Sequence, residues 1–159
     1  MLYKVGDKVA HPLHGAGVID SIETHKIGGA EREYYVLKMP VGDMLVKIPK
    51  ETSDVIGVRP IISREQVGSL LSAIPGIQVE VNQNWNKRYR ENMLRIRSGD
   101  LLEVAAVVKS LLFRDSTHGL STGERKMLRS AKTILISEMA LSQQSTYDEV
   151  ERQLYTAMH

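Results

Sequence analysis

Hydrophobic and polar residues alternate in short runs over the first sixty residues of the chain. This period of two is typical of strands that bury one face. Glycines and prolines separate the runs, and the pair Gly28-Gly29 tolerates the positive φ that a tight hairpin turn requires. The pattern predicts strands at residues 8–11, 17–27, 31–39, 44–49 and 55–58.

The run at residues 44–49 shows this alternation clearly. Met44, Val46 and Ile48 are predicted to point to one face, and Leu45 and Lys47 to the other. Short antiparallel strands packed into about sixty residues indicate a small SH3-like or Tudor-like β-barrel. Such barrels usually serve as binding modules, although the fold alone does not name the ligand.

Beyond residue 60 the hydrophobic residues recur at spacings of three and four, the period of a helix with one buried face. Pairs in which Ser, Thr or Asp precedes Glu or Gln by three residues mark helix starts at residues 63, 100, 121 and 146. A further helix is predicted to begin near Trp85, after a polar loop at 77–84. The chain is therefore predicted to be an α+β protein, with the barrel at residues 1–60 and a compact all-α domain at residues 61–159.

The predicted helix that begins near Trp85 carries most of the excess positive charge. The formal net charge of the whole chain is only +2, and Trp85 is its single tryptophan. Between residues 84 and 97 the one acid, Glu91, stands against these cations: Lys87, Arg88, Arg90, Arg95 and Arg97. Cations attract phosphate and an aromatic ring can insert at a base step, so the segment favours nucleic acid as a partner.

Helical periodicity leaves the role of Trp85 open. Steps of 100° per residue place Trp85, Tyr89, Met93 and Ile96 on one stripe, and such a stripe is more often core than a binding surface. Trp85 also lies in the first turn after a polar loop, where a side chain can project past the end of the helix and backbone N–H groups can meet phosphate. A buried ring and an exposed ring both remain possible.

Composition and motifs exclude several other classes of protein. The chain has no cysteine, which rules out disulfides and thiolate metal sites and fits a reducing compartment. Neither a signal pattern nor a run of ~18 apolar residues is present, so we expect a cytoplasmic protein without a membrane partner. His11 and His14 lack a third metal ligand at a useful spacing, and no phosphate-binding loop or serine-nucleophile motif occurs. We expect no metal, cofactor, small-molecule ligand or enzymatic activity.

Taken together, segments spread over residues 1–142 resemble the CarD/CdnL family of bacterial transcription regulators, which bind RNA polymerase. Each segment is short, but their number and order make the resemblance specific. The matching segments are Tyr3-Lys4-Val5-Gly6-Asp7-Lys8-Val9, His14-Gly15-Ala16-Gly17-Val18-Ile19, Glu33-Tyr34-Tyr35-Val36-Leu37-Lys38, Val46-Lys47-Ile48-Pro49, Gly57-Val58-Arg59, Asn84-Trp85-Asn86-Lys87-Arg88-Tyr89, Ser98-Gly99-Asp100 and Gly119-Leu120-Ser121-Thr122-Gly123-Glu124-Arg125-Lys126-Met127-Leu128.

The resemblance implies a polymerase contact made by the barrel. In this family the N-terminal domain docks on the β subunit of RNA polymerase, largely through an edge strand. The matching residues here are Met44, Val46, Lys47, Ile48 and Pro49, with His25 on a neighbouring run. Relatives often have Arg at the positions of Lys47 and His25, and neither Lys nor His reproduces its planar fork.

The resemblance also implies a DNA contact made by the helical domain at the upstream edge of the melted promoter bubble. Trp85 matches a wedge in the minor groove, and the cations that match phosphate contacts are Lys87, Arg88, Arg90, Arg125 and Lys126. The expected protein is a monomer that binds promoter DNA without reading its sequence, stabilises the open complex and catalyses nothing.

Two other kinds of protein remain as alternatives. One is a pure protein–protein interaction module of the transcription machinery, with Trp85 buried and no contact to DNA. The other is a polymerase-binding domain used by a different DNA machine, as in transcription-repair coupling factors; the absence of a helicase segment argues against it.

Overall fold

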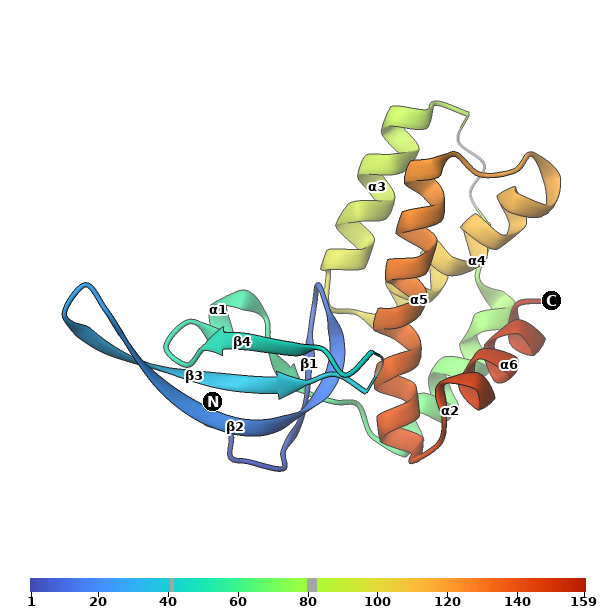
Figure 1. Cartoon of the computed structure of the whole chain (residues 1–159). Coiled ribbons are helices and arrows are strands. Elements are labelled where there is room, and N and C mark those ends of the chain that lie inside the picture. The colour runs from blue at the N-terminus through green and yellow to red at the C-terminus, as the bar shows by residue number, and fades with distance from the viewer. Residues whose placement is uncertain (41, 80–82) are drawn as a thin grey trace.

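The computed structural model describes residues 1–40, 42–79 and 83–159. Within these ranges an antiparallel sheet precedes a group of packed helices, which confirms the α+β fold (Figure 1). The strands lie in the order β4-β3-β2-β1-β5. Their bounds are β1 Lys8–His11, β2 Gly15–Ile27, β3 Ala30–Lys38, β4 Leu45–Pro49 and β5 Arg59–Pro60.

Strands β2 and β3 form a long hairpin whose tip projects away from the rest of the molecule (Figure 1). Gly28 and Gly29 at the tip have φ values of 61° and 83°, as the predicted tight turn requires. Nearer the sheet centre the register shifts between Ile19 and Ser21, a bulge of the kind that bends a strand. The buried core of the sheet comprises Tyr3, Val9, Ile19, Tyr35, Leu37, Met39, Ile48 and Val58.

The prediction of a strand at residues 55–58 is wrong. Residues Ser53–Ile56 form the short helix α1, which ends at Gly57 in the left-handed conformation (φ 102°). The apolar character of Val55 misled the prediction, because this side chain is 89% exposed and packs into no core. The last strand is instead β5, which pairs with β1.

The helices begin where the capping patterns place them. Ser63 and Ser121 form complete capping boxes with Gln66 and Glu124. The bounds are α2 Arg64–Ala73, the 3-10 turn η1 Ile74–Gly76, α3 Trp85–Arg97, α4 Leu101–Thr117, α5 Thr122–Gln143 and α6 Tyr147–Met158. The loop predicted at 77–84 includes residues 80–82, which lie outside the described residues.

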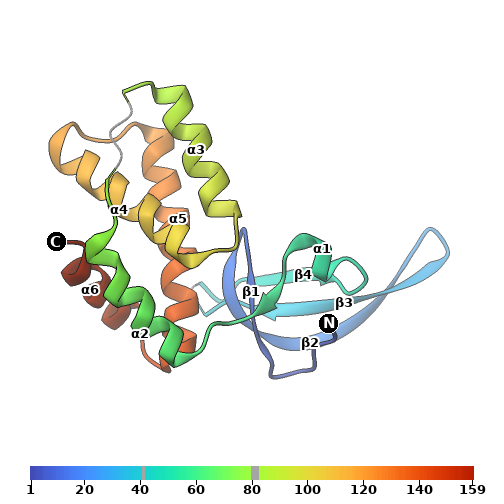
Figure 2. The same ribbon diagram turned by 180° about the vertical axis from the view of Figure 1, so that it is seen from behind.

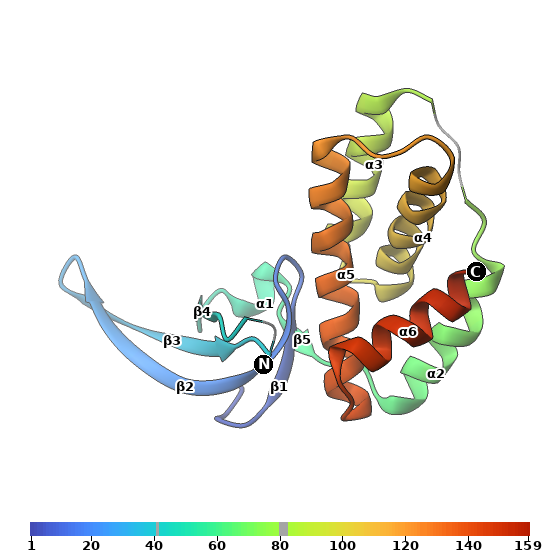
Figure 3. The same ribbon diagram turned by 45° about the vertical axis from the view of Figure 1, so that its right-hand side comes forward.

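Helix α5 packs against strand β2 and also against helices α2, α4 and α6 (Figures 1, 2 and 3). Its face toward the sheet meets the start of β2, where the backbone N–H of Ala16 donates to Ser137 Oγ at 2.9 Å. Gly15 allows this approach, because a Cβ there would lie 2.5 Å from Ser137 Oγ. Helix α5 is therefore buried on two sides along its C-terminal half.

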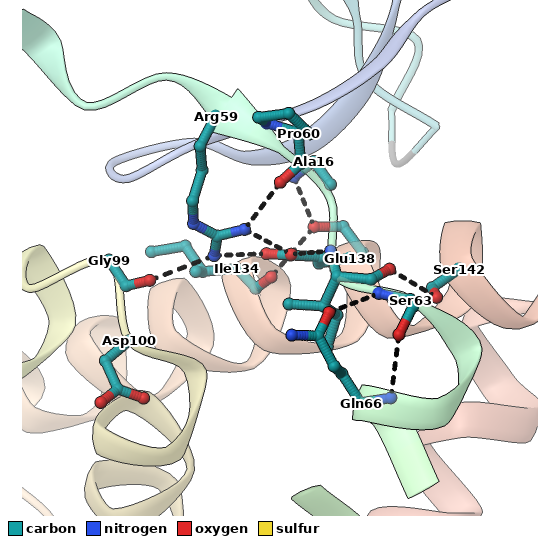
Figure 4. A network of polar contacts seen from close by, with 12 residues as sticks. Ala16, Arg59, Pro60, Ser63, Gln66, Gly99, Asp100, Ile134, Glu138 and Ser142 are labelled. Carbon is teal, nitrogen blue, oxygen red and sulfur yellow. Dashed lines mark hydrogen bonds and ion pairs between the residues drawn. The ribbon is translucent and has the colours of Figure 1, made fainter. Parts of the chain in front are cut away.

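A buried carboxylate on α5 joins the two parts of the chain. Glu138 is 1% exposed and receives two hydrogen bonds from the guanidinium of Arg59, at 2.7 and 2.9 Å (Figure 4). The backbone N–H of Ile62 donates to the same carboxylate, and Arg59 also donates to the carbonyl of Gly99. Strand β5 and the segment that follows it are thus bound directly to α5.

Candidate nucleic-acid and polymerase interfaces

Strand β4 forms one edge of the sheet, and within the described residues it pairs with β3 alone. Ile48 is 1% exposed and Val46 packs against the same core, whereas Leu45 and Lys47 are exposed, as alternation predicted. Met44 precedes the strand and is 48% exposed, so it does not share the burial of Ile48. A partner at this edge would meet the β4 backbone and exposed side chains, not the side chain of Ile48.

The structure brings Lys47 and His25 together around a carboxylate that sequence reasoning left out of this site. Glu23 Oε2 lies 2.9 Å from His25 Nε2 and 3.1 Å from Lys47 Nζ. Hydrogen bonds from His25 and Lys47 hold the pKa of the Glu23 carboxyl below its usual value. The alternation of β2 offered a signal, because residues 23 and 25 share one face.

Trp85 begins α3 and leaves part of its ring open to solvent. The preceding Asn84 caps the helix by accepting from the backbone N–H of Lys87 at 3.1 Å. Trp85 is 43% exposed, and its ring stacks on Tyr89 with centroids 5.1 Å apart and planes at 19°. Along the predicted stripe, burial increases to Ile96, which is 4% exposed. The alternative that requires a buried tryptophan therefore does not fit the structure.

The cations of α3 separate into exposed and buried positions. Lys87 and Arg90 are exposed, but Arg88 is 9% exposed and its Nε donates to Glu124 Oε2 at 3.2 Å. The expectation that Arg88 faces phosphate on the surface does not fit this placement. Arg88 shares the buried face with Asn92, four residues on, and Glu124 of α5 supplies the opposite charge that burial demands.

Helix α5 adds cations at the same end of the molecule. Helices α3 and α5 both begin at this end, the upper end in Figure 1. Arg125 and Lys126 are exposed in the first turn of α5, and Arg129, which sequence reasoning did not single out, is exposed one turn later. In α5, all of whose residues are described, both acids are buried, so the exposed charges are cations.

These features give the upper end a positive potential. The N-terminus of a helix carries partial positive charge and unpaired N–H groups, and here two helices present such ends together. The first two turns of these helices carry the half-exposed indole of Trp85 and exposed cations, namely Lys87, Arg90, Arg125 and Lys126. The arrangement can hold phosphates beside an apolar ring without reading base edges.

His11 and His14, near the first turn, form no cluster of metal ligands with other described residues. Their rings lie 4.6 Å apart, and no group of three His, Asp or Glu side chains within residues 1–40, 42–79 and 83–159 could hold a metal ion. Burial, with a smaller contribution from His14, lowers the pKa of His11 to about 4. In the described part of the chain no helix combines the length and apolar character needed to cross a membrane.

Comparison with known proteins links both halves of the chain to one family. Residues 3–62 match the model of the CarD-like/TRCF RID domain, and residues 69–155 match the model of the CarD C-terminal domain. A protein of Bacillus subtilis (strain 168) named "Putative transcription factor YdeB" is 28% identical over 150 residues, which cover 94% of this chain and 98% of that protein. The family consists of transcription regulators, not enzymes. The chain belongs to the CarD-like family of transcription factors, and this membership implies an interaction with RNA polymerase.

Proposed function

We propose that this protein binds the β subunit of RNA polymerase through residues 1–60 and promoter DNA through residues 61–159, and thereby stabilises the open complex. The protein acts as a monomer in the bacterial cytoplasm. Edge strand β4 and the exposed cation Lys47 form the polymerase contact, with His25 beside them. Family membership supports the polymerase, and an unpaired strand edge supports the place of contact.

The observation that carries the DNA contact is the half-exposed Trp85 at an end where two helix N-termini and exposed cations meet. The indole enters the minor groove at the upstream edge of the melted bubble, where distorted DNA accommodates an apolar wedge. Lys87, Arg90, Arg125 and Lys126 contact phosphate, which makes the attraction dependent on salt and indifferent to sequence. Arg88 supports this surface from beneath.

Stabilisation follows from differential binding. A ligand that binds open promoter DNA better than closed DNA shifts the equilibrium by the difference in its affinities. The net charge of +2 is too small to hold free DNA strongly. The polymerase contact keeps the helical part at a high effective concentration near the promoter, so even a weak DNA contact forms there.

The test is the lifetime of the open complex on one promoter with wild-type protein and Trp85→Ala. We expect the variant to fold and bind polymerase normally but to shorten the lifetime toward that without the protein. Leu94→Ala is the control, because Leu94 is 71% exposed on the same helix, about 13 Å further along its axis. A loss of about 3 kcal/mol or more in folding stability for Trp85→Ala would identify the ring as core and contradict the wedge.

A further inference from the structure

The hydroxyl of Ser121 uses its full hydrogen-bonding capacity, and one of its partners is Trp85. A serine hydroxyl has one donor and two acceptor positions. Ser121 Oγ accepts from Trp85 Nε1 and from the backbone N–H of Glu124, each at 3.2 Å, and donates to Glu124 Oε1 at 3.2 Å. The residue that caps α5 therefore also binds the indole that begins α3.

Glu124 fixes the direction in which this hydroxyl points. Its carboxylate is 3% exposed, and Oε1 takes the Ser121 hydroxyl while Oε2 takes Arg88. The guanidinium Nε of Arg114 lies 3.7 Å from the same Oε2. Burial raises the pKa of the Glu124 carboxyl, but Arg88 and Ser121 outweigh it and hold the pKa below its usual value. The carboxylate stays ionised and keeps accepting from Ser121.

Three contacts restrict the indole. Tyr89 stacks against one face, which fixes the plane of the ring. Gly123 lies beside both rings, where a Cβ would be 3.7 Å from Trp85 and 3.8 Å from Tyr89. The bond to Ser121 prevents the ring from turning over within that plane, because only one edge of an indole carries an N–H.

We propose that Ser121 is the positioning residue for Trp85: its hydroxyl holds the indole in the orientation that meets DNA, and Glu124, paired with Arg88, orients the hydroxyl. The inference rests on the proposed function for its consequence at the promoter. An indole that is already oriented loses less conformational freedom when it enters the groove, so the contact is stronger. The buried Arg88 then acts on DNA through Trp85 instead of through phosphate.

The first experiment measures the mobility of the indole in the free protein. Trp85 is the only tryptophan, so time-resolved fluorescence anisotropy reports on this ring alone. We expect Ser121→Ala to increase its fast local motion and Ser121→Thr, which keeps a hydroxyl, to restore the wild-type value. Ser63→Ala is the matched control, because it removes the same kind of capping box from α2, at the other end of the helical part (Figure 1). Unchanged mobility in Ser121→Ala would overturn the proposal.

The second experiment measures open-complex lifetime with the same variants. The loss of one hydrogen bond predicts a lifetime shortened about threefold to tenfold for Ser121→Ala, with recovery in Ser121→Thr and no change in Ser63→Ala. Equal shortening by Ser63→Ala would attribute the effect to helix capping and reject positioning. If Trp85→Ala itself leaves the lifetime unchanged, the proposed function fails, whereas the anisotropy still shows whether Ser121 orients the ring.

Discussion

Arg88 and Arg90 are two residues apart in the sequence and occupy opposite environments in the fold. Arg90 is exposed, whereas Arg88 is buried against Glu124. Helical periodicity identifies the residues that share a face of the helix. It does not identify a buried charged residue, because such a residue is expected to be exposed unless its partner is known. That partner lies 36 residues further along the chain. At this scale the local pattern predicted the helix and its cations, but the expectation that Arg88 faces phosphate does not fit its burial.

His11 gives a pH prediction at the residue scale. It is 7% exposed, and its Nδ1 accepts from the backbone N–H of Leu13 at 3.1 Å, so it folds as the neutral form. Its pKa falls from 6.5 to about 4, chiefly through burial. The unfolded chain therefore binds the proton first as pH falls. The contribution of His11 to the free energy of unfolding is fully present above pH 6.5. It decreases as the pH falls toward 4, by up to about 3 kcal/mol.

Urea unfolding between pH 7 and pH 4 checks this expectation against His11→Asn, whose amide oxygen can still accept from Leu13. We expect a flatter dependence in the variant. Glu124, whose pKa is lowered, also loses stabilisation as the pH falls below about 5, but it does so in both proteins, so the difference between their slopes reports His11. Identical slopes for both proteins would show that His11 is not the responsible group.

Secondary-structure elements give this protein its two exposed surfaces by different means. Strand β4 is exposed because it has one neighbour in the described sheet, so its outer backbone groups remain available. The other surface is the end of the helical part at which α3 and α5 both begin. A strand edge recognises another chain by hydrogen bonding, and helix starts recognise anions. The two surfaces suit a protein partner and DNA, respectively.

Lys47→Glu tests the strand surface. The change reverses the exposed charge on β4 and adds a second carboxylate beside Glu23, 3.1 Å from the present ammonium. We expect binding to the isolated β subunit to weaken about tenfold or more, because like charges at an interface are strongly unfavourable. Pull-down and binding titration measure it.

Lys8→Glu is the control for this change, since Lys8 is equally an exposed lysine but lies on β1, with two strands between it and β4. The control should bind as the wild type does. Unchanged binding by Lys47→Glu would remove β4 from the polymerase contact.

Across the whole molecule, α5 links the two surfaces. Ser121 at its start contacts Trp85, and Glu138 near its end binds Arg59 of strand β5. These residues are about 26 Å apart along a straight helix. A rigid connection of this kind would fix the distance between the proposed DNA contact and the proposed polymerase contact, so that both could form at once without a search by a flexible linker.

Arg59→Ala tests this connection, because it leaves the buried carboxylate of Glu138 without its cation. Removing one partner of a buried pair typically costs 3–5 kcal/mol, and we expect a loss of about 3 kcal/mol because Ile62 N–H still binds Glu138. Denaturant unfolding measures the loss, and a shorter open-complex lifetime at unchanged β-subunit affinity would report the loosened link. The control is Lys50→Ala, since Lys50 pairs with the exposed Glu33 and should matter little. Equal stability of both variants would contradict the connection.

The sequence alone determined the local features: helix starts, the Gly28-Gly29 turn, the alternation of β4 and the position of Trp85 at the start of α3. Their causes, capping bonds, turn geometry and side-chain period, act within a few residues. Only the tertiary structure decided that Arg88 is buried, that Ser121 holds Trp85, and that Val55 belongs to no strand. It also decided the burial of Glu138, which binds Arg59 across 79 residues. Such pairings depend on which faces meet in space, and no local pattern encodes that.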